Sequence, residues 1–254
     1  MSLQKTEAVV LKTQRLGETS KILTLYSRKF GKLKVVAKGS RGLKSRFFGT
    51  LELLNHISIV YYFKETRELQ LLSQADIIHP FVGVREDLEK YSLASFFCEL
   101  IDRTQLEQPN IYLFQVLVES LKEIEKIKEN TINVFFWFIL KFLHISGFKP
   151  HFEACKICRK PGNQNSVRFS LIDGSYTCGN CKNSAPMSIT VPVEAINYLH
   201  SLQVAPINKT NVLTVVSPES CETLLFSFLQ YHIEEAKYLK SMKFLRQIQN
   251  SKLI

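Results

Sequence analysis

Short runs that alternate apolar and polar residues follow one another along the first third of the chain. Gly or polar residues separate these runs at spacings of about ten residues, which is typical of short β-strands in a small barrel or sandwich. The five runs are EAVVLKT (7–13), KILTLYS (21–27), KLKVVAK (32–38), HISIVYYF (56–63) and ELQLLSQA (68–75).

After His79-Pro80 the apolar residues recur with helical spacing. Two amphipathic helices are predicted, one over residues 88–101 and one over 114–124. The segment INVFFWFILKFLHISGF (132–148) is apolar on nearly all sides, which predicts a buried central helix with Thr131 as its N-cap and Gly147 as its stop. Helical periodicity resumes over residues 219–248.

The chain carries an excess of positive charge that is concentrated in its N-terminal third, and this indicates the kind of molecule it binds. The formal net charge is +10, and residues 1–79 hold 14 Lys/Arg against 6 Asp/Glu. This excess favours a polyanion, with nucleic acid ahead of an anionic membrane surface. The N-terminus lacks the apolar run of a secretory signal, and VFFWFIL (134–140) is too short to span a bilayer. We therefore expect a cytoplasmic protein whose cysteines are reduced.

The basic residues concentrate between Glu18 and Glu52, where nine occur without one acid. In a strand, alternation places Lys32, Lys34 and Lys38 on one face. Successive residues of one face are about 6.6 Å apart, which is close to the phosphate repeat of an extended single strand. The alternative is a solvated outer strand whose lysines discourage aggregation. The basic run continues through a Gly-flanked turn, which favours a polyanion surface. The residues predicted to form it are Lys21, Lys32, Lys34, Lys38, Arg41, Lys44 and Arg46.

Two details of this segment bear on its chemistry. GSRGLKS is not a nucleotide-binding P-loop, because the motif requires glycine at the positions of Lys38 and Leu43. Of Phe47 and Phe48, at least one is expected in the core, and an exposed ring would be able to stack on bases. The sequence shows no Ser/His/Asp or Cys/His arrangement and no convincing carboxylate pair, so we expect a protein that is not an enzyme.

Four cysteines form two C-x2-C pairs separated by nineteen residues: Cys155, Cys158, Cys178 and Cys181. The intervening VRFSLIDGSYTC reads as a hairpin that returns the second pair beside the first, as a zinc ribbon requires. Disulfides are the alternative, which the expected compartment disfavours. One structural Zn²⁺ per chain is therefore predicted, because four thiolates leave no position for a reactive water. Around the site lie candidates for a second nucleic-acid contact: Lys156, Arg159, Lys160 and Arg168.

Together these patterns predict a multidomain α+β protein. Its parts are a small N-terminal β-barrel of the oligonucleotide/oligosaccharide-binding (OB) type that binds nucleic acid (1–79), the first part of an α-helical domain (80–149), an embedded four-cysteine zinc ribbon (150–190), and the C-terminal part of the helical domain (191–254).

The order of these features resembles the bacterial recombination mediator family RecO. The resemblance covers nearly the whole chain and is carried by four groups of residues. One departure is Arg159, where a glycine is expected after the second cysteine. The groups are FGKLKVVAKGSRGLKSRFFGTLE (30–52), TRELQLLSQADIIHPF (66–81), GFKPHFEACKIC (147–158) with TCGNC (177–181), and YLKSMKFL (238–245).

The resemblance implies a non-enzymatic role in recombinational DNA repair of the RecF type. Such proteins bind single- and double-stranded DNA, anneal complementary strands, and help to load the recombinase onto strands coated by single-strand-binding protein. The implied partners are RecR and the acidic C-terminal tail of single-strand-binding protein, and the expected location is the nucleoid. Candidates for binding that tail are Lys240, Lys243 and Arg246.

Three other classes stay open at this point. A zinc-ribbon protein that binds RNA or takes part in translation would share the basic barrel and the cysteines. A hydrolase with a site that the sequence does not reveal is a second alternative. A protein of the membrane surface is the least favoured of the three, because the basic segment is strand-like and lacks an amphipathic helix.

Overall fold

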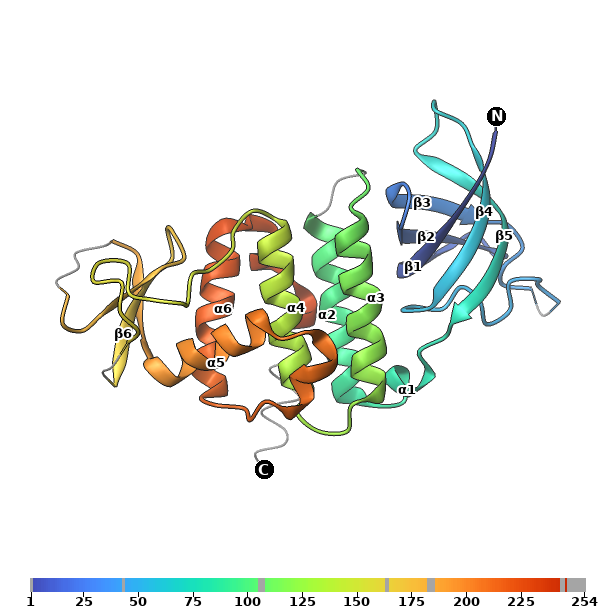
Figure 1. The fold of residues 1–254 in the computed structure, drawn as a ribbon. Coiled ribbons are helices and arrows are strands. Elements are labelled where there is room, and N and C mark those ends of the chain that lie inside the picture. The colour runs from blue at the N-terminus through green and yellow to red at the C-terminus, as the bar shows by residue number, and fades with distance from the viewer. Residues whose placement is uncertain are drawn as a thin grey trace. The chain divides into compact units, whose positions relative to one another are not determined.

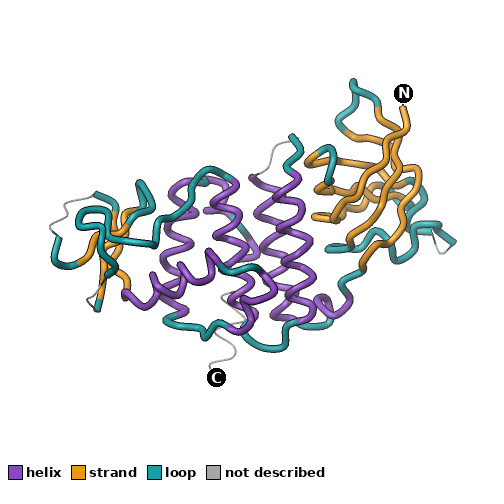
Figure 2. The backbone as a smooth tube through the Cα atoms, viewed as in Figure 1, coloured by secondary structure: helices purple, strands orange, loops and turns teal. Residues whose placement is uncertain are grey.

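The computed structural model describes residues 2–42, 44–104, 108–162, 165–181, 186–242 and 245. The chain divides into two compact units, residues 1–125 with 238–254 (the barrel unit) and residues 126–237 (the cysteine unit). Strands occur in both units, as a five-stranded barrel in the first and a three-stranded sheet in the second (Figure 2).

Five strand pairings, four antiparallel and one parallel, join the barrel into a closed ring in the order β1-β2-β3-β5-β4 (Figure 1). Only the pair β3–β5 is parallel, and β1 closes the ring by pairing with both β2 and β4. The predicted OB-like barrel is thereby confirmed. The strands are β1 (Ser2–Leu16), β2 (Ser20–Ser27), β3 (Gly31–Ala37), β4 (His56–Phe63) and β5 (Leu69–His79).

Alternation decides which side chains fill the barrel. In β3, the side chains of Val35 and Ala37 are fully buried, whereas the side chain of Lys34 is exposed. A bulge in β1 between Val10 and Lys12 bends this long strand, as ring closure requires. The core of the barrel consists of Ala8, Val10, Leu23, Leu25, Val35, Ala37, Phe47, Leu51, Ile57, Ile59, Tyr61 and Leu72.

Three helices follow the barrel strands in the described part of this unit. The two predicted amphipathic helices are present as α2 and α3, and each buries its apolar stripe. The Tyr26 ring of β2 packs against Phe114 of α3 with centroids 6.5 Å apart. The helices are α1 (Val82–Arg85), α2 (Leu88–Thr104) and α3 (Ile111–Lys126).

The cysteine unit is built around the apolar helix α4 (Thr131–Ile145), whose prediction as a buried helix is confirmed. The predicted N-cap is wrong by one residue: Thr131 is the first helical residue, and Asn130 precedes it with φ 59 and no side-chain cap. The helix predicted over 219–248 is also too long, since α6 (Pro218–His232) ends before Ile233. None of the described helices is long and apolar enough to span a membrane.

The rest of this unit is made of short elements. The predicted hairpin is present as β6 (Ser166–Ser170) and β7 (Tyr176–Cys178), and β8 (Ser188–Pro192) pairs with the other edge of β6. The remaining helical segments are α5 (Val193–Val204), η1 (Ile207–Val212) and η2 (Glu234–Tyr238). The last residue of η2, Tyr238, is the first residue of the C-terminal segment that belongs to the barrel unit.

Candidate nucleic-acid surface and metal centre

The outer face of β3 carries the lysines that alternation predicts. Lys34 lies opposite Thr24 of β2 and points away from the barrel core that Val35 enters from the next position. Lys38 follows the end of β3 in the same phase and is exposed. The strand therefore divides its residues into an apolar inner row and a basic outer row.

Five of the predicted residues are exposed on β3 and on the loop that follows it, and we call these five the basic surface. None of the five makes an ion pair with a carboxylate in the described ranges of the chain. Their charges are therefore not engaged in ion pairs within the described fold, which leaves them available for sequence-independent phosphate contacts. The members of the basic surface are Lys34, Lys38, Arg41, Lys44 and Arg46, all exposed.

Arg41 also fixes the loop that carries it. Its backbone N–H donates to the Thr19 carbonyl at 2.9 Å, and its Nη1 donates to the Gly17 carbonyl at 3.0 Å. Both carbonyls belong to the turn between β1 and β2. A guanidinium has five N–H donors, so this attachment is compatible with a phosphate contact by the same side chain.

The structure gives Lys21 and Lys32 partners within the fold. Lys21 Nζ pairs with Glu52 Oε1 at 3.1 Å, and Lys32 Nζ donates to the Asp102 carbonyl at 2.7 Å, near the C-terminal end of α2. A phosphate would have to share these lysines with their present partners. Their role in binding stays a prediction, and it is weaker than that of the basic surface.

The two phenylalanines of the loop are divided between core and solvent. Phe47 is buried in the barrel core, whereas Phe48 is 80% exposed. Asn55 holds this loop, because its Nδ2 donates to the carbonyls of Gly49 at 3.0 Å and Thr50 at 2.9 Å. Arg46 lies over the Phe47 ring at 4.9 Å. The fixed loop therefore presents one aromatic ring to solvent beside cationic side chains.

In the cysteine unit, the four predicted ligands come together. The Sγ atoms of Cys155, Cys158, Cys178 and Cys181 all lie within 4.8 Å of one another, with 3.8 Å from Cys158 to Cys178 and 3.6 Å from Cys178 to Cys181. A tetrahedron with metal–sulfur bonds of about 2.3 Å has edges of about 3.8 Å. These separations are too long for a disulfide bond. The cluster therefore fits a metal ion held by four sulfurs.

The hairpin places the two cysteine pairs. Cys178 ends β7 opposite Val167 of β6, and the turn that follows brings Cys181 back through a 3.0 Å hydrogen bond from its N–H to the Cys178 carbonyl. The first pair is attached to the same strand, since the Lys156 N–H donates to the Tyr176 carbonyl at 2.9 Å. The pairing of β6 with β7 thus sets the distance between the two cysteine pairs.

Backbone N–H groups stabilise the thiolate of Cys155. Burial alone would raise the pKa of this thiol, but hydrogen bonds from the N–H groups of Cys178, Cys158 and Ile157 outweigh it and lower the pKa to about 6. The thiolate is the form that binds a metal. The local backbone therefore favours the ligating state of this residue near neutral pH.

Arg159, the departure from the family pattern, has a left-handed backbone with φ 59. Glycine adopts this conformation without cost, whereas other residues pay about 1 kcal/mol or more. We expect Arg159→Gly to raise the melting temperature of the metal-loaded protein by about 2–4 °C. Arg159→Ala removes the same charge but keeps the strained Cβ, so it should give no such rise. Equal melting temperatures for the two variants would contradict this explanation.

The other predicted residues stay predictions. Lys156 pairs with Asp173 and Arg168 donates to Ser188 Oγ at 3.5 Å, while Arg159 and Lys160 are exposed beside the cysteine cluster. Near the C-terminus, Lys240 is exposed. Lys243 and Arg246 lie outside the described residues.

Sequence reasoning missed the turn between β4 and β5. It carries Arg67 and is held by the buried side chain of Gln70. The mixed charges of KETRE (64–68) make it look like an ordinary solvated turn. The signal that would have found it is topological, because in barrels of this type the β4–β5 loop flanks the ligand-binding face.

Comparison with known families finds matches over both units. The family profile described as Recombination protein O N terminal matches residues 1–81, and the one described as Recombination protein O C terminal matches residues 85–243. The first match covers the barrel, and the second covers the helices and the cysteine cluster.

Curated relatives match along almost their whole length. A protein of Thermoanaerobacter sp. (strain X514) named DNA repair protein RecO is 31% identical, with 98% of this chain and 100% of the relative covered. The proteins of the same name from Bacillus subtilis (strain 168) and Chloroherpeton thalassium (strain ATCC 35110 / GB-78) are 29% and 28% identical. They cover 98% and 97% of this chain, and 96% and 99% of their own lengths are matched.

Proposed function

Because the chain belongs to the RecO family of DNA repair and recombination proteins, we propose that it is a non-enzymatic recombination mediator. In this role it binds single- and double-stranded DNA and anneals complementary strands. It also helps to load the recombinase onto strands coated by single-strand-binding protein. RecR and the acidic tail of single-strand-binding protein are its proposed partners, and the nucleoid in the cytoplasm is its proposed location.

The observation that carries the proposal is the basic surface on the outside of the barrel. Its five cations have no ion-pair partner in the described part of the chain, so a phosphate backbone meets uncompensated charge. Phosphate contacts carry no base information, which suits a protein that must act on any sequence. Two strands that share one cationic surface repel each other less, and this favours annealing.

We assign Zn²⁺ to the four-cysteine cluster, with a structural role. Cys155, Cys158, Cys178 and Cys181 would hold it, and their thiolates fill a tetrahedral shell. The bound ion supplies folding free energy and no reaction chemistry. Its proposed effect is to fix the β6–β7 hairpin and the two turns that carry the cysteines.

Annealing is the activity that tests the proposal. Two complementary oligonucleotides labelled with a donor and an acceptor dye should anneal faster when the protein is added, both bare and coated with single-strand-binding protein. A non-complementary pair is the control for aggregation. Unchanged annealing rates under both conditions would contradict the proposal. Preferential binding of structured RNA over single-stranded DNA at one salt concentration would favour the RNA-binding alternative instead.

The exposed ring of Phe48 should contribute to binding of single strands. We expect Phe48→Ala to weaken binding of oligo(dT) about tenfold, because stacking of a base on an aromatic ring is worth about 1–3 kcal/mol. Phe48→Tyr keeps a stacking ring and should bind like the wild type. Fluorescence anisotropy measures both. Equal affinities for the alanine and tyrosine variants would remove Phe48 from the interface.

A further inference from the structure

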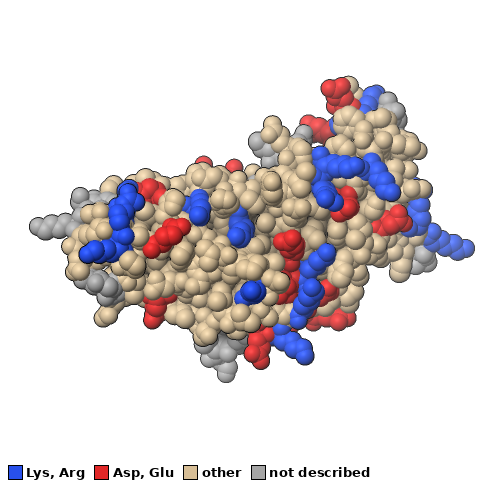
Figure 3. All heavy atoms as spheres, in the orientation of Figure 1, with Lys and Arg blue, Asp and Glu red and all other residues tan. Residues whose placement is uncertain are grey.

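The segment between β3 and β4, residues 38–55, carries most of the basic surface, and we call it the β3–β4 loop. All cations of that surface except Lys34 lie on this loop, and Phe48 is exposed there. Figure 3 shows Lys and Arg side chains that extend into solvent at the right-hand edge, where Figure 1 places the loop. Over residues 38–42 and 44–55 the loop contains no helix or strand, so no ladder of backbone hydrogen bonds holds these cations.

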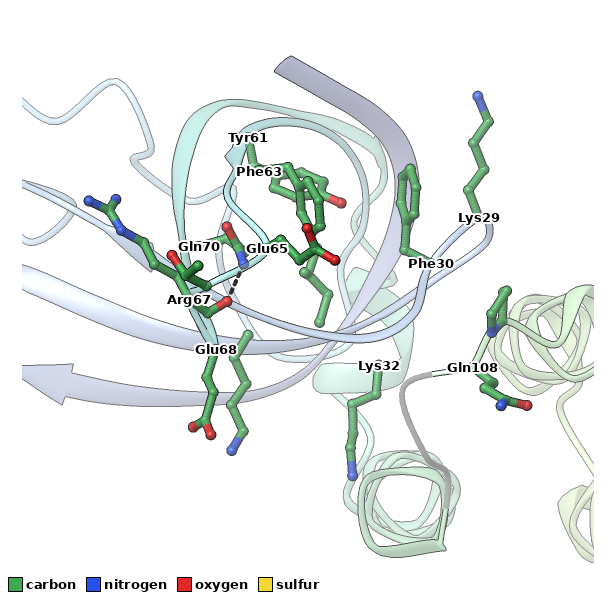
Figure 4. A pocket seen from close by; sticks show the side chains of 14 residues that line it. Lys29, Phe30, Lys32, Tyr61, Phe63, Glu65, Arg67, Glu68, Gln70 and Gln108 are labelled. Atoms are coloured by element: carbon green, nitrogen blue, oxygen red, sulfur yellow. Dashed lines mark hydrogen bonds between the residues drawn. The ribbon is translucent and has the colours of Figure 1, made fainter. Parts of the chain in front are cut away.

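Hydrogen bonds within the β3–β4 loop form local turns. The Ser45 N–H donates to the Gly42 carbonyl at 3.0 Å, and the Phe48 N–H donates to the Ser45 carbonyl at 3.1 Å. Each bond joins residues three positions apart, so it shapes a turn without attaching the loop to the barrel. The pocket in Figure 4 does not hold the loop either, because none of the described loop residues lines it. The place of the loop therefore depends on contacts with other segments.

Asn55, the last residue of the loop, is fully buried and uses both ends of its side chain. Its Nδ2 donates to the Gly49 and Thr50 carbonyls, which uses both N–H donors of the amide. Its Oδ1 accepts a hydrogen bond of 2.6 Å from Nη1 of Arg85, the last residue of α1. The same Nη1 donates to the Leu53 carbonyl at 3.2 Å. A chain of hydrogen bonds therefore runs from α1 through Asn55 to the middle of the loop.

The charge of Arg85 is directed at the loop and not at an acid. Within the described chain Arg85 makes no ion pair with a carboxylate, and the residue is partly buried. Hydrogen bonds from a charged donor are about twice as strong as neutral ones. Both acceptors of its side chain lie within the last three residues of the loop. Arg85 therefore anchors the end of the loop to α1.

Leu54, between the two residues that Arg85 bonds, has a strained backbone. It is fully buried with φ 72, a left-handed conformation that a residue other than glycine adopts at a cost. Such a residue persists only where its surroundings fix it. The Leu54 N–H donates to the Val10 carbonyl and the Val10 N–H donates to the Asn55 carbonyl, both at 3.0 Å. Bonds from β1 and from Arg85 thus hold the end of the loop in one conformation.

The solvent-facing side chains next to the bonded segment depend on it. Phe48 directly precedes the two carbonyls that Asn55 bonds. Arg46 lies over the Phe47 ring at 4.9 Å, on the same side of the loop sequence. Arg41, by contrast, is attached separately to the β1–β2 turn. The bonds of Asn55 therefore bear on one part of the basic surface and not on all of it.

We propose that Arg85 and Asn55 are positioning residues, which hold the outer part of the β3–β4 loop so that Arg46 and Phe48 face DNA. Neither positioning residue touches DNA itself. The inference rests on the proposed function, since it concerns the orientation of residues on the same surface. It makes the affinity of the barrel for DNA depend on α1, the first helix after the barrel.

Substitution of Arg85 tests the positioning role. Arg85→Ala should weaken binding of oligo(dT) about fivefold, less than the about tenfold loss expected when the Phe48 ring itself is removed. The log–log salt slope should become about 0.7 units shallower, because Arg46 no longer meets its phosphate. Arg85→Lys should restore both quantities, since an ammonium has three N–H donors for the two oxygens. Lys122→Ala removes one exposed charge of α3 and should bind like the wild type.

Trypsin reports the position of the loop in the absence of DNA. Cleavage after Arg46, identified by mass spectrometry, should be severalfold faster in Arg85→Ala than in the wild type or in Arg85→Lys. The melting temperature and cleavage outside the loop should change little, which confines the effect to the loop. Asn55→Ala changes no charge and should lose affinity and protection alike, so it carries the test if Arg85→Ala does not fold.

A double-mutant cycle separates positioning from direct contact with DNA. In the background Arg46→Ala with Phe48→Ala, the side chains that the loop presents are absent, so Arg85→Ala should change the affinity by less than about 1.5-fold. In the background Lys34→Ala with Lys38→Ala, which leaves those side chains in place, Arg85→Ala should retain its about fivefold effect. An equal loss in both backgrounds would show that Arg85 contacts DNA directly or acts through general stability, and would overturn the proposal.

The outcomes also separate this inference from the proposed function. If the wild type does not bind oligo(dT), both fail. If the wild type binds, and Arg85→Ala matches Lys122→Ala in affinity, salt slope and cleavage after Arg46, only the positioning role fails. Binding by Arg85→Lys that is as weak as binding by Arg85→Ala would also contradict it, because lysine keeps the charge and the donors.

Discussion

Replacing Lys34, Lys38 and Arg41 together by alanine should weaken binding of single-stranded DNA about 30-fold at low salt. Each exposed cation contributes up to about 1 kcal/mol to a contact with an anion, and the three act on one polymer. The loss of three contacts should also make the salt slope about 2 units shallower. Anisotropy titrations with oligo(dT) at several salt concentrations measure both quantities.

The control for this variant also removes three positive charges, but at positions away from the basic surface. Lys122, Lys126 and Lys128 are exposed lysines around the C-terminal end of α3, and their triple alanine variant should retain most of the affinity. The Arg41 side chain donates a hydrogen bond to the Gly17 carbonyl of the β1–β2 turn, so its loss would also change the loop. The double variant Lys34→Ala with Lys38→Ala keeps this bond and measures the effect on DNA binding alone. Equal affinity and slope for the test and control variants would contradict the assignment of the basic surface.

Loss of one sulfur ligand should have the largest effect on stability. Wild-type protein should carry about one equivalent of zinc after gel filtration, and Cys178→Ser should carry almost none. Structural zinc contributes about 10–16 kcal/mol of apparent binding free energy in small zinc domains, so the cysteine unit should unfold at a much lower denaturant concentration. Elemental analysis and circular dichroism measure these two results.

Cys221 offers a matched control in the same unit. It is a buried cysteine outside the cluster, and its Sγ donates to the Val216 carbonyl at 3.4 Å, a contact that a serine hydroxyl is able to reproduce. Cys221→Ser should keep its zinc and lose only modest stability. Zinc retained by Cys178→Ser, or lost equally from both variants, would contradict a site made of the four sulfurs.

The barrel strands and the four-cysteine cluster were predictable because their signals are local. Alternation along β3 places Val35 inside and Lys34 outside, whatever the rest of the chain does. The C-x2-C spacing and the intervening hairpin likewise determine which cysteines meet. In both cases the residues that decide the outcome lie within a few positions, or within one hairpin, of one another.

Contacts between distant segments were not predictable. Lys21 and Lys32 belong to the same basic run as Lys34, but the carboxylate of Glu52 and the end of α2 reach them only in the folded barrel. Which phenylalanine of the pair enters the core depends on the loop that Asn55 holds.

Short helices near the C-terminal end were missed for a different reason. Residues 207–212 form a 3₁₀ turn held by one side chain of α4: Asn133 Nδ2 donates to the carbonyls of Thr210 at 2.7 Å and Leu213 at 2.8 Å. Such a turn has no amphipathic period of its own. The buried polar side chain of Asn133, in a helix whose sequence is apolar on nearly all sides, determines the position of the turn.

The dependence of DNA affinity on salt for the unmodified protein tests the central claim most directly. Oligo(dT) and a mixed-sequence oligonucleotide of equal length should bind with similar affinity. If all five residues of the basic surface meet phosphates, the log–log salt slope should be about −3.5 for both. A slope near zero, or a strong preference for one sequence, would contradict a surface that recognises the phosphate backbone.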